Sequence, residues 1–191
     1  MNYCGNCGGP LTQRIPEGDT RSRDVCDSCL TIHYENPKMV AGCLVLWEDR
    51  VLLCRRAIEP RYGLWTLPAG FMENAETTNE AAARETWEEA HARVEIEGLY
   101  TLFNLPHINQ VYLMFRARLC DLDFGPGTES LEVALFHEND IPWDQIAFPA
   151  VRETLKLYYA DRIHGHYPFR VGDILKDADS RDCRVRLLFG P

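Results

Sequence analysis

The stretch that decides the fold of this chain is Gly70-Phe-Met-Glu-Asn-Ala-Glu76-Thr-Thr-Asn-Glu80-Ala-Ala-Ala-Arg84-Glu85-Thr-Trp-Glu88-Glu89-Ala-His91-Ala92. It predicts a helix from Thr77 onward, because Thr77 can cap the first turn and Glu80, three residues later, can complete a capping box. The three alanines that follow Glu80 are strong helix formers.

The acidic residues of this helix gather on one side. At about 100° per residue, Glu85, Glu88 and Glu89 fall within one arc. The opposite side is expected to pack in the core and comprises Ala83, Trp87 and Ala90. Like charges at these spacings destabilise an isolated helix by about 0.2–0.5 kcal/mol per pair, so a bound cation explains the arrangement well. Hard divalent cations, chiefly Mg²⁺ or Mn²⁺, fit carboxylate ligands best, and the alternative is a solvated acidic face.

The spacing of the charged residues is a second observation. Five residues separate Gly70 from Glu76, and seven residues separate Glu76 from the run Arg84-Glu85-x-x-Glu88-Glu89. This pattern resembles the signature of the Nudix hydrolases at every charged position and every interval. Two positions depart from the family pattern, Thr86 in place of an aliphatic residue and His91 in place of the glycine that usually ends the helix. A residue at the end of a helix often adopts the left-handed conformation, which His tolerates better than a β-branched residue does. Neither departure removes a candidate metal ligand.

The resemblance implies which groups bind the metal. In the family, two glutamates of the helix and a backbone carbonyl just before the first glycine hold the essential cation. In this chain these groups are Glu89, Glu85 and the carbonyl of Ala69, and Glu88 is a further ligand of metal or water.

The resemblance also implies roles for residues that do not bind the metal directly. Arg84 is expected to orient a neighbouring glutamate, and Glu76 to stabilise the turn into the helix. A general base outside the signature often lies on a downstream loop of these enzymes. Glu132 is our first candidate for that base, and Glu129 is the second.

Two further groups of residues are candidates for substrate contacts. A basic cluster ahead of the acidic helix can meet substrate phosphates and consists of Arg55, Arg56 and Arg61. Aromatic residues near the predicted site can stack on an adenine or flavin ring and are Tyr62, Trp65, Phe103 and Tyr112. The alternatives are surface charge for the arginines and core packing for the aromatic residues.

The eight cysteines fall into two groups. Four are paired as Cys4-x-x-Cys7 and Cys26-x-x-Cys29, a spacing typical of four-cysteine zinc sites. A disulfide framework is the alternative, and a reducing compartment disfavours it. We therefore predict a small zinc ribbon in which the metal replaces a hydrophobic core. The ribbon is expected to brace the main domain or contact a second copy, ahead of binding nucleic acid. The remaining four are expected to be buried thiols and are Cys43, Cys54, Cys120 and Cys183.

The segments on both sides of the acidic helix have strand character. Strands are predicted over residues 39–47, 51–54, 93–104, 110–119 and 133–136, the first two joined as a hairpin. Apolar residues at helical spacing predict a second helix over 148–162. This order suits an α+β fold with a mixed sheet between two helices. The resemblance implies the same architecture, a Nudix-like α/β/α sandwich preceded by the ribbon.

The chain is therefore expected to contain three parts. Residues 1–32 form the zinc ribbon, and residues 38–162 form the Nudix-like domain. Residues 163–191 are an extension of unknown role. The apolar content of this extension predicts packing on the domain or across a dimer rather than disorder.

Composition restricts the partners. A net charge of −9 argues against broad electrostatic binding to nucleic acid or to an anionic membrane. No run approaches the roughly 18 apolar residues of a membrane span, and the first residues lack the pattern of a signal peptide. We expect a cytoplasmic homodimer that acts on a small nucleotide.

The resemblance implies cleavage of a nucleoside diphosphate linked to another group, X. A ribbon ahead of such a domain is similar to the NADH pyrophosphatases, but residues 101–110 lack the Pro- and Trp-rich motif of that group. Pro106 is a feature shared with ADP-ribose hydrolases, and the layout is similar to plant-type enzymes acting on FAD and ADP-ribose. FAD and ADP-ribose are therefore expected ahead of NADH.

Two other functions compete with this one. A non-catalytic ligand sensor with a nucleic-acid-binding ribbon is disfavoured because Glu85, Glu88 and Glu89 are all present. Hydrolysis of RNA ends is disfavoured by the net charge.

Overall fold

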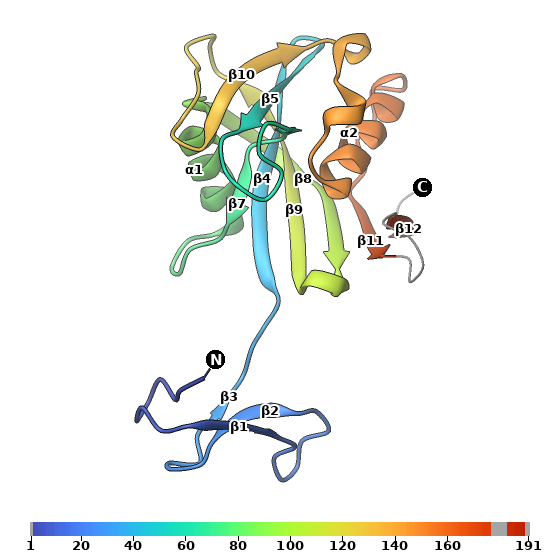
Figure 1. Ribbon diagram of the computed structural model, residues 1–191. Helices are drawn as coiled ribbons and strands as arrows, with labels where there is room; N and C mark the ends of the chain where they lie inside the picture. Colours follow the sequence, from blue (N-terminus) through green and yellow to red (C-terminus); the bar gives the residue numbers. More distant parts are fainter. Residues whose placement is uncertain (1, 177–182, 190–191) are drawn as a thin grey trace. The chain divides into compact units, whose positions relative to one another are not determined.

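The computed structural model describes residues 2–176 and 183–189. The chain divides into two compact units, the first ending at Pro37 and the second beginning at Lys38 (Figure 1). No helix within the described residues is long and apolar enough to cross a membrane.

The first unit is a three-stranded antiparallel sheet. Its strands are β1 (Leu11–Arg14), β2 (Arg23–Cys26) and β3 (Ile32–His33), in the order β1-β2-β3. The buried hydrophobic residues described in this unit are Cys4, Val25 and Cys26. Two of these three are cysteines, so side-chain packing alone supplies little of its stability.

The second unit is built on one mixed sheet. Its strands are β4 (Lys38–Trp47), β5 (Arg50–Arg56), β6 (Trp65–Thr66), β7 (Ala69–Phe71), β8 (Val94–Leu105), β9 (Gln110–Leu119), β10 (Ser130–Phe136), β11 (Arg170–Lys176) and β12 (Cys183–Phe189). The described strands run in the order β10-β5-β4-β9-β8-β11-β12, with β6 beside β5 and β7 beside β4. β4 pairs in parallel with β9, and β11 with β8, while the other pairs are antiparallel.

Two helices cover opposite faces of this sheet (Figure 1). They are α1 (Thr78–Ala90) and α2 (Pro149–Arg162), and the short 3-10 helices are η1 (Pro106–Ile108), η2 (Glu138–Asp140) and η3 (Trp143–Gln145). The predicted α+β fold with a mixed sheet between two helices is confirmed.

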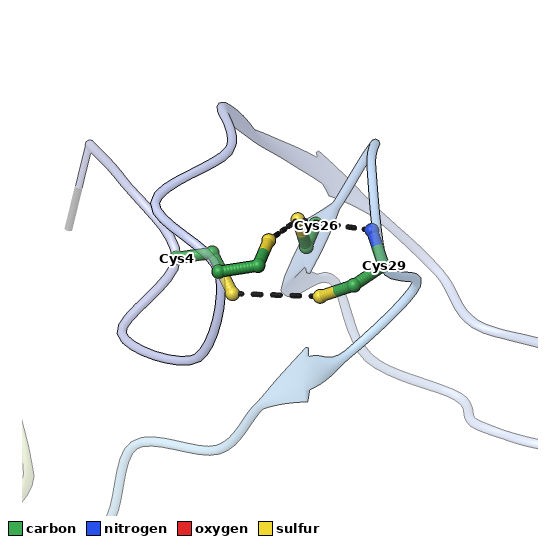
Figure 2. Close-up of side chains that lie close together, drawn as sticks. Cys4, Cys26 and Cys29 are labelled. Atoms are coloured by element: carbon green, nitrogen blue, oxygen red, sulfur yellow. Dashed lines mark hydrogen bonds between the residues drawn. The ribbon is translucent and has the colours of Figure 1, made fainter.

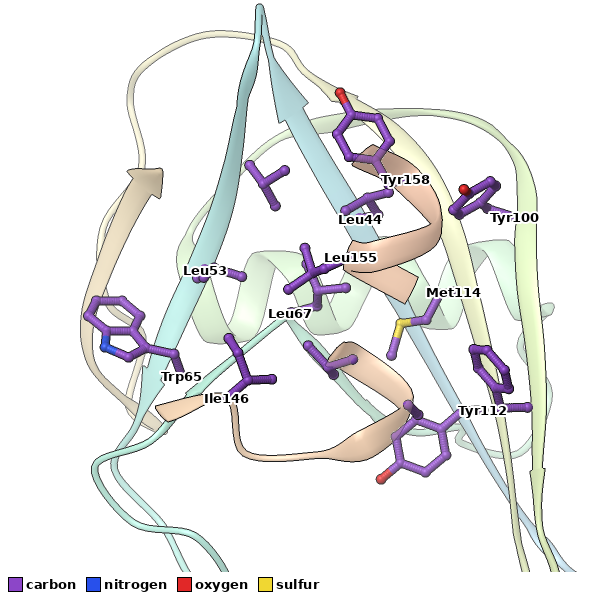
Figure 3. Packing of buried hydrophobic residues seen from close by; sticks show 14 of the residues in the cluster. Leu44, Leu53, Trp65, Leu67, Tyr100, Tyr112, Met114, Ile146, Leu155 and Tyr158 are labelled. Carbon is purple, nitrogen blue, oxygen red and sulfur yellow. The ribbon is translucent and has the colours of Figure 1, made fainter. Parts of the chain in front are cut away.

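Alternation along β4 explains the three layers. Val40 and Leu44 point into a core with Leu155 and Tyr158 of α2 (Figure 3). The intervening residues of β4 point into a second core with the alanines of α1 and are Ala41, Cys43 and Val45. A strand that is apolar at nearly every position is the expected pattern for a sheet covered on both faces.

The elements predicted on both sides of α1 are present. The hairpin pairs Leu46 with Val51 and Trp47 with Arg50, which leaves a tight turn at Glu48-Asp49. β8 and β9 occupy the predicted strand segments, and Pro149 opens α2 at a position where its missing N–H costs nothing.

The ends of α1 follow the prediction, but its buried face does not. Thr77 and Glu80 form the capping box, and His91 ends the helix in the left-handed region at φ 47°. Trp87, predicted to face the core, is instead 50% exposed. The side chains that α1 buries against the sheet are small, among them Ala82, Thr86 and Ala90. A tryptophan on this side would hold the helix too far from the sheet for these residues to pack.

The extension after α2 packs on the domain where it is described. β11 pairs with β8 and β12 pairs with β11, and the Ile174 side chain is fully buried. Residues 177–182 and 190–191 of the extension lie outside the described residues.

The prediction of four buried thiols is correct for Cys43 and Cys54 and wrong for Cys120, which is exposed. Cys120 directly follows the last residue of β9, so its side chain leaves the core where the strand ends. Cys183 is half-buried at the start of β12.

Candidate active site

A cleft of about 1310 Å³ lies at one end of the sheet. Val40 of β4, Leu105 of β8 and Tyr112 of β9 form part of its wall, and these residues lie near the strand ends that meet there. The signature residues line the same cleft, including Ala69, Gly70, Arg84, Glu85, Glu88 and Glu89. The fold therefore collects the acidic face of α1 and the loop before it into one concave site.

Glu89 is the most deeply buried carboxylate of the site, with 6% of the residue exposed. Burial raises the pKa of Glu89 to about 8, and the neighbouring charge of Glu85 adds to the increase. The backbone N–H of Ala69 donates to Glu89 Oε2 at 3.3 Å, and this hydrogen bond lowers the pKa of Glu89. A buried glutamate with a raised pKa inside a cleft is typical of a functional site.

Glu85 lies against the backbone of Gly70. A Cβ atom added at Gly70 would lie 2.3 Å from Glu85 Oε2, so a residue with a side chain cannot occupy this position without moving the carboxylate. Burial also raises the pKa of Glu85, and the guanidinium of Arg84 lowers it. Gly70 is thus required for the close approach of a carboxylate to the loop.

Arg84 connects three glutamates. Its guanidinium donates to Glu76 at 3.0 and 2.7 Å, to Glu85 at 2.7 Å and to Glu88 at 3.1 Å. It also donates to the backbone oxygen of Phe71 at 3.2 Å. These bonds hold the pKa of Glu76 down at about 2, so Glu76 is ionised whenever the protein is folded near neutral pH.

A glycine-containing loop satisfies the C-terminal carbonyl groups of α1. The N–H of Gly125 donates to Ala90 O at 2.9 Å, and the N–H of Gly127 donates to Glu89 O at 3.0 Å. A Cβ at Gly127 would lie 1.7 Å from Glu88 O, so the loop can approach this closely only with glycine there. The loop places Glu129 in the lining of the cleft. The negative charge of Glu129 raises the pKa of both Glu85 and Glu89.

Glu132, the first candidate for the general base, points to another surface. It forms an ion pair with Arg55 at 3.7 Å, and the two are cross-strand partners of β10 and β5. Neither residue is among those that line the cleft.

Arg56 and Arg61 do line the cleft. Arg56 is 9% exposed, donates from Nε to Pro60 O at 3.0 Å, and stacks on the ring of Phe148 with its guanidinium carbon 5.0 Å from the centroid. Its charge lowers the pKa of Glu89. The structure therefore separates the three predicted arginines, with two in the cleft and Arg55 beside Glu132.

The four predicted aromatic residues are likewise separated. Tyr112 lines the cleft, whereas Trp65 and Phe103 are buried in the core and Tyr62 is exposed outside the cleft lining. The aromatic residues of the cleft that sequence reasoning missed are Phe71, Trp87 and Phe148. Phe71 directly follows Gly70 and Trp87 directly precedes Glu88, so adjacency to the signature was the available signal. Phe148 gave no comparable signal.

The four cysteines of the first unit form a second site (Figure 2). Their sulfur atoms all lie within 4.8 Å of one another, with Cys4 Sγ 3.7 Å from Cys29 Sγ and Cys7 Sγ 3.5 Å from Cys26 Sγ. The backbone N–H groups of Ser28 and Cys29 both donate to Cys26 Sγ at 3.4 Å. Four converging sulfurs, of which Cys26 Sγ accepts two backbone hydrogen bonds, suit a tetrahedral zinc site.

Within the described residues, the four cysteines are the one group of potential metal ligands whose donor atoms all lie within 4.8 Å of one another. The carboxylate groups of α1 are more widely spread. Arg84 draws Glu85 and Glu88 toward itself, whereas Glu89 is turned to the N–H of Ala69. The donor set nevertheless suits a hard cation, because the carboxylate groups of Glu85, Glu88 and Glu89 all line one cleft.

Comparison with known protein families gives two adjacent matches. The Nudix N-terminal zinc-ribbon model matches residues 2–35, and the NUDIX domain model matches residues 36–155, which is more than half of the chain.

Individual proteins resemble the chain to different degrees. A crystal structure of a NUDIX hydrolase from Nitrosomonas europaea has 59% sequence identity and a TM-score of 0.89, covering 91% of this chain and 99% of that one. An ADP-ribose pyrophosphatase from Streptococcus suis, at 23% identity, has a TM-score of 0.59 over 71% of this chain and 99% of its own, and shares the fold.

The curated NAD-capped RNA hydrolases that match are longer than this chain. An NAD-capped RNA hydrolase NudC from Stutzerimonas stutzeri is 29% identical over 84% of this chain and 57% of its own length. The chain thus spans little more than half of that relative.

Proposed function

The chain belongs to the Nudix hydrolase family and carries the family's N-terminal zinc-ribbon segment, and on this premise we propose that it hydrolyses the phosphoanhydride bond of a nucleoside diphosphate linked to another group, X. The observation that carries the proposal is the pair of cleft carboxylates Glu85 and Glu89, both of raised pKa. Perturbed carboxylates gathered in a cleft are typical of a functional site, and carboxylate oxygens are ligands that hard divalent cations prefer.

Glu85, Glu89 and the carbonyl of Ala69 would hold the catalytic cation, with Glu88 as a further ligand. When bound, Mg²⁺ or Mn²⁺ would neutralise negative charge on the phosphate oxygens and lower the pKa of the water molecule bound to it. Metal binding requires both carboxylates to be ionised. The raised pKa of Glu89 therefore makes metal binding release a proton near neutral pH.

The residues of the chain divide the remaining tasks. Arg84 positions Glu85 and Glu88 through direct hydrogen bonds, and Glu76 holds Arg84. Glu129 is the better candidate for general base than Glu132, because Glu129 lines the cleft that Glu132 does not reach. A general base must lie within hydrogen-bond reach of the water that it activates.

Arg56 and Arg61 contact the substrate phosphates. The stack on Phe148 and the bond to Pro60 O fix the Arg56 guanidinium at the cleft wall and occupy only Nε. Its terminal nitrogens offer the planar pair of donors that suits a phosphate group. Arg55 is excluded from this role by its bonds to Gly63 O and Glu132.

The substrate is an ADP-containing compound, with FAD and ADP-ribose ahead of NADH. The cleft is larger than the roughly 300–1,000 Å³ typical of a site for one small ligand, so it accommodates two groups joined by a diphosphate. Tyr112, Phe71 and Trp87 provide aromatic surfaces for a base within it.

A second candidate is cleavage of NADH or of NAD-capped RNA. It is favoured by the NudC relatives at 28–33% identity. It is disfavoured by a net charge of −9, because broad contact with an RNA backbone depends on basic residues.

The first unit binds a structural zinc ion through Cys4, Cys7, Cys26 and Cys29. The convergence of the four sulfurs supports this assignment, as does the small number of buried residues in the unit. Zinc would then supply folding free energy that this short segment otherwise lacks.

A substrate panel tests the proposed reaction. The purified protein is incubated with FAD, ADP-ribose, NADH, NAD⁺, NAD-capped RNA and nucleoside triphosphates, in Mg²⁺ or in Mn²⁺, and the phosphorylated products are identified by chromatography. The proposal expects AMP and the phosphorylated form of X from FAD or ADP-ribose at the highest kcat/KM. Release of nicotinamide-containing products at a higher kcat/KM selects the second candidate.

A further inference from the structure

The cleft continues past the acidic helix to the C-terminal strands. We call this part the tail-side wall and define it as Leu105, His107, Ile108, Gln110, Lys176 and Cys183. Lys176 and Cys183 are paired across β11 and β12, so these strands present two neighbouring side chains to the cleft. Both residues lie beyond the matched family domain, which ends at residue 155.

The strands that carry this wall are firmly attached. β11 pairs in parallel with β8 from Arg170 to Asp173. Asp173 accepts hydrogen bonds from Asn104 at 3.1 Å and from Arg186 at 2.6 and 3.2 Å. Asp173 and Ile174 are buried, so the bonds and the packing fix the end of β11 beside η1.

The tail-side wall lies too far from the carboxylates to touch the same phosphate. Ala69 is in β7, which pairs with β4, and three strand steps separate β4 from β11 in the order β4-β9-β8-β11. Neighbouring strands lie about 4.8 Å apart, so the separation is on the order of 15 Å. The wall can therefore meet the far half of a substrate whose diphosphate lies at the acidic helix.

The chemistry of the wall selects a class of ligand. Ile108, which is 47% exposed, offers apolar surface suited to a ring face, whereas Leu105 is almost fully buried in the wall. Lys176 donates hydrogen bonds only, and the amide of Gln110 can both donate and accept. No carboxylate is among the six residues of the wall, so nothing in it repels hydrogen-bond acceptors.

We propose that the tail-side wall binds group X of the substrate as a planar ring carrying carbonyl oxygens, with Lys176 donating to one of them. The inference rests on the proposed function, because it concerns the far half of the same substrate. A flavin ring satisfies it, whereas the terminal ribose of ADP-ribose has no planar ring to offer. Lys176 is thus a specificity-determining residue supplied by the C-terminal extension.

The test compares Lys176→Met with a matched control, Lys156→Met. Lys156 is an exposed lysine of α2 that pairs with Glu153 at 2.8 Å and does not line the cleft. We measure kcat and KM for FAD and for ADP-ribose in the wild type and both variants. Loss of one hydrogen bond from a charged donor is expected to raise the KM for FAD by about tenfold with kcat unchanged. The KM for ADP-ribose is expected to stay within about twofold, and Lys156→Met to change neither.

A binding measurement separates failure of this inference from failure of the proposed function. The Kd values of FMN, riboflavin and AMP are measured for the same proteins without turnover. Lys176→Met should weaken FMN and riboflavin by about tenfold and leave AMP unchanged. If the wild type hydrolyses neither FAD nor ADP-ribose, the proposed function fails and these Kd values decide the inference.

Three results would overturn the inference. The first is an unchanged KM for FAD in Lys176→Met. The second is an equal rise in KM for FAD and for ADP-ribose, which would mean that Lys176 contacts a part of the substrate that both compounds share. The third is weaker binding of FMN with unchanged binding of riboflavin, which makes Lys176 a phosphate contact rather than a ring contact.

Discussion

Arg84 donates two hydrogen bonds to Glu76, from Nε at 3.0 Å and from Nη2 at 2.7 Å. The remaining guanidinium nitrogen, Nη1, reaches Glu85 and Glu88. A carboxylate that precedes α1 therefore sets the orientation of an arginine that in turn orients two carboxylates of the helix. We therefore expect Glu76 to be important for activity although it is not among the proposed metal ligands.

Replacing Glu76 with Gln should lower kcat/KM by about tenfold and increase the Mg²⁺ concentration needed for half-maximal activity. The neutral amide attracts the guanidinium less strongly, so the charge of Arg84 is left to Glu85 and Glu88, which it already contacts, and competes more strongly with the cation. Activity is measured over a Mg²⁺ titration. Glu80→Gln is the control, because a glutamine retains the capping box of α1. Equal Mg²⁺ requirements in both variants would contradict the role given to Glu76.

Replacing Glu89 with Gln should reduce turnover by at least about a thousandfold, roughly 4 kcal/mol of transition-state stabilisation. The substitution keeps the size of the side chain but removes the charge proposed to hold the cation. Thermal unfolding with and without Mg²⁺ gives a readout independent of turnover, and the variant should lose the stabilisation that Mg²⁺ gives the wild type. Near-normal hydrolysis by Glu89→Gln would show that the acidic helix is not the metal site.

The pKa of Glu89 also predicts how stability depends on pH when no divalent cation is added. The folded-state pKa of about 8 lies above the ordinary value of 4.5, so between these values the folded protein binds more protons than the unfolded one. The free energy of unfolding should therefore fall as pH rises from about 5 to 8. Urea unfolding of the second unit at several pH values measures this slope. Glu89→Gln should show a smaller slope, and identical slopes would refute the assignment.

Gly127→Ala should destabilise the second unit by about 2 kcal/mol and lower activity. The added methyl group collides with Glu88 O, so the loop must withdraw from the end of α1 and carry Glu129 with it. Gly125→Ala is the matched control, because a Cβ there meets nothing within 4 Å. Urea unfolding and turnover are measured for both variants. Similar losses in the two would mean that the close approach at Gly127 is not the cause.

The purified protein should contain about one zinc ion per chain, and Cys26→Ser should unfold the first unit while leaving the second folded. The two units are separately compact, so loss of the metal site need not disturb the sheet of the second. Elemental analysis and hydrogen exchange of each unit provide the measurements. Absence of zinc together with disulfides among these cysteines would exclude the site.

Local patterns were sufficient to predict the elements that depend on local chemistry. The capping box at Thr77 and the hairpin around Glu48-Asp49 each follow from a few neighbouring residues, and the family resemblance placed the helix end at His91. The layered sheet followed from the order of the strands and helices.

Features that depend on distant parts of the chain were not predictable in this way. The periodicity of α1 could place Trp87 opposite the glutamates, but it could not show that the sheet accepts only small side chains there. Glu129 and Glu132 are three residues apart, and a register shift in β10 between Ser130 and Glu132 lies between them. Only the packing of the Gly127 loop on α1 reveals which of the two faces the cleft.

The parallel pairing of β11 with β8 has a consequence for the solubility of shortened forms. A fragment ending at Arg162 would leave the backbone groups of β8 that bond to β11 uncovered, and a bare strand edge is a template for aggregation. In the described chain the corresponding edge strand is β12, which carries Arg184 and Arg186. Charged side chains on an edge strand oppose pairing with other chains. The extension thus serves as a protective border of the sheet, and a minimal catalytic fragment without it should aggregate.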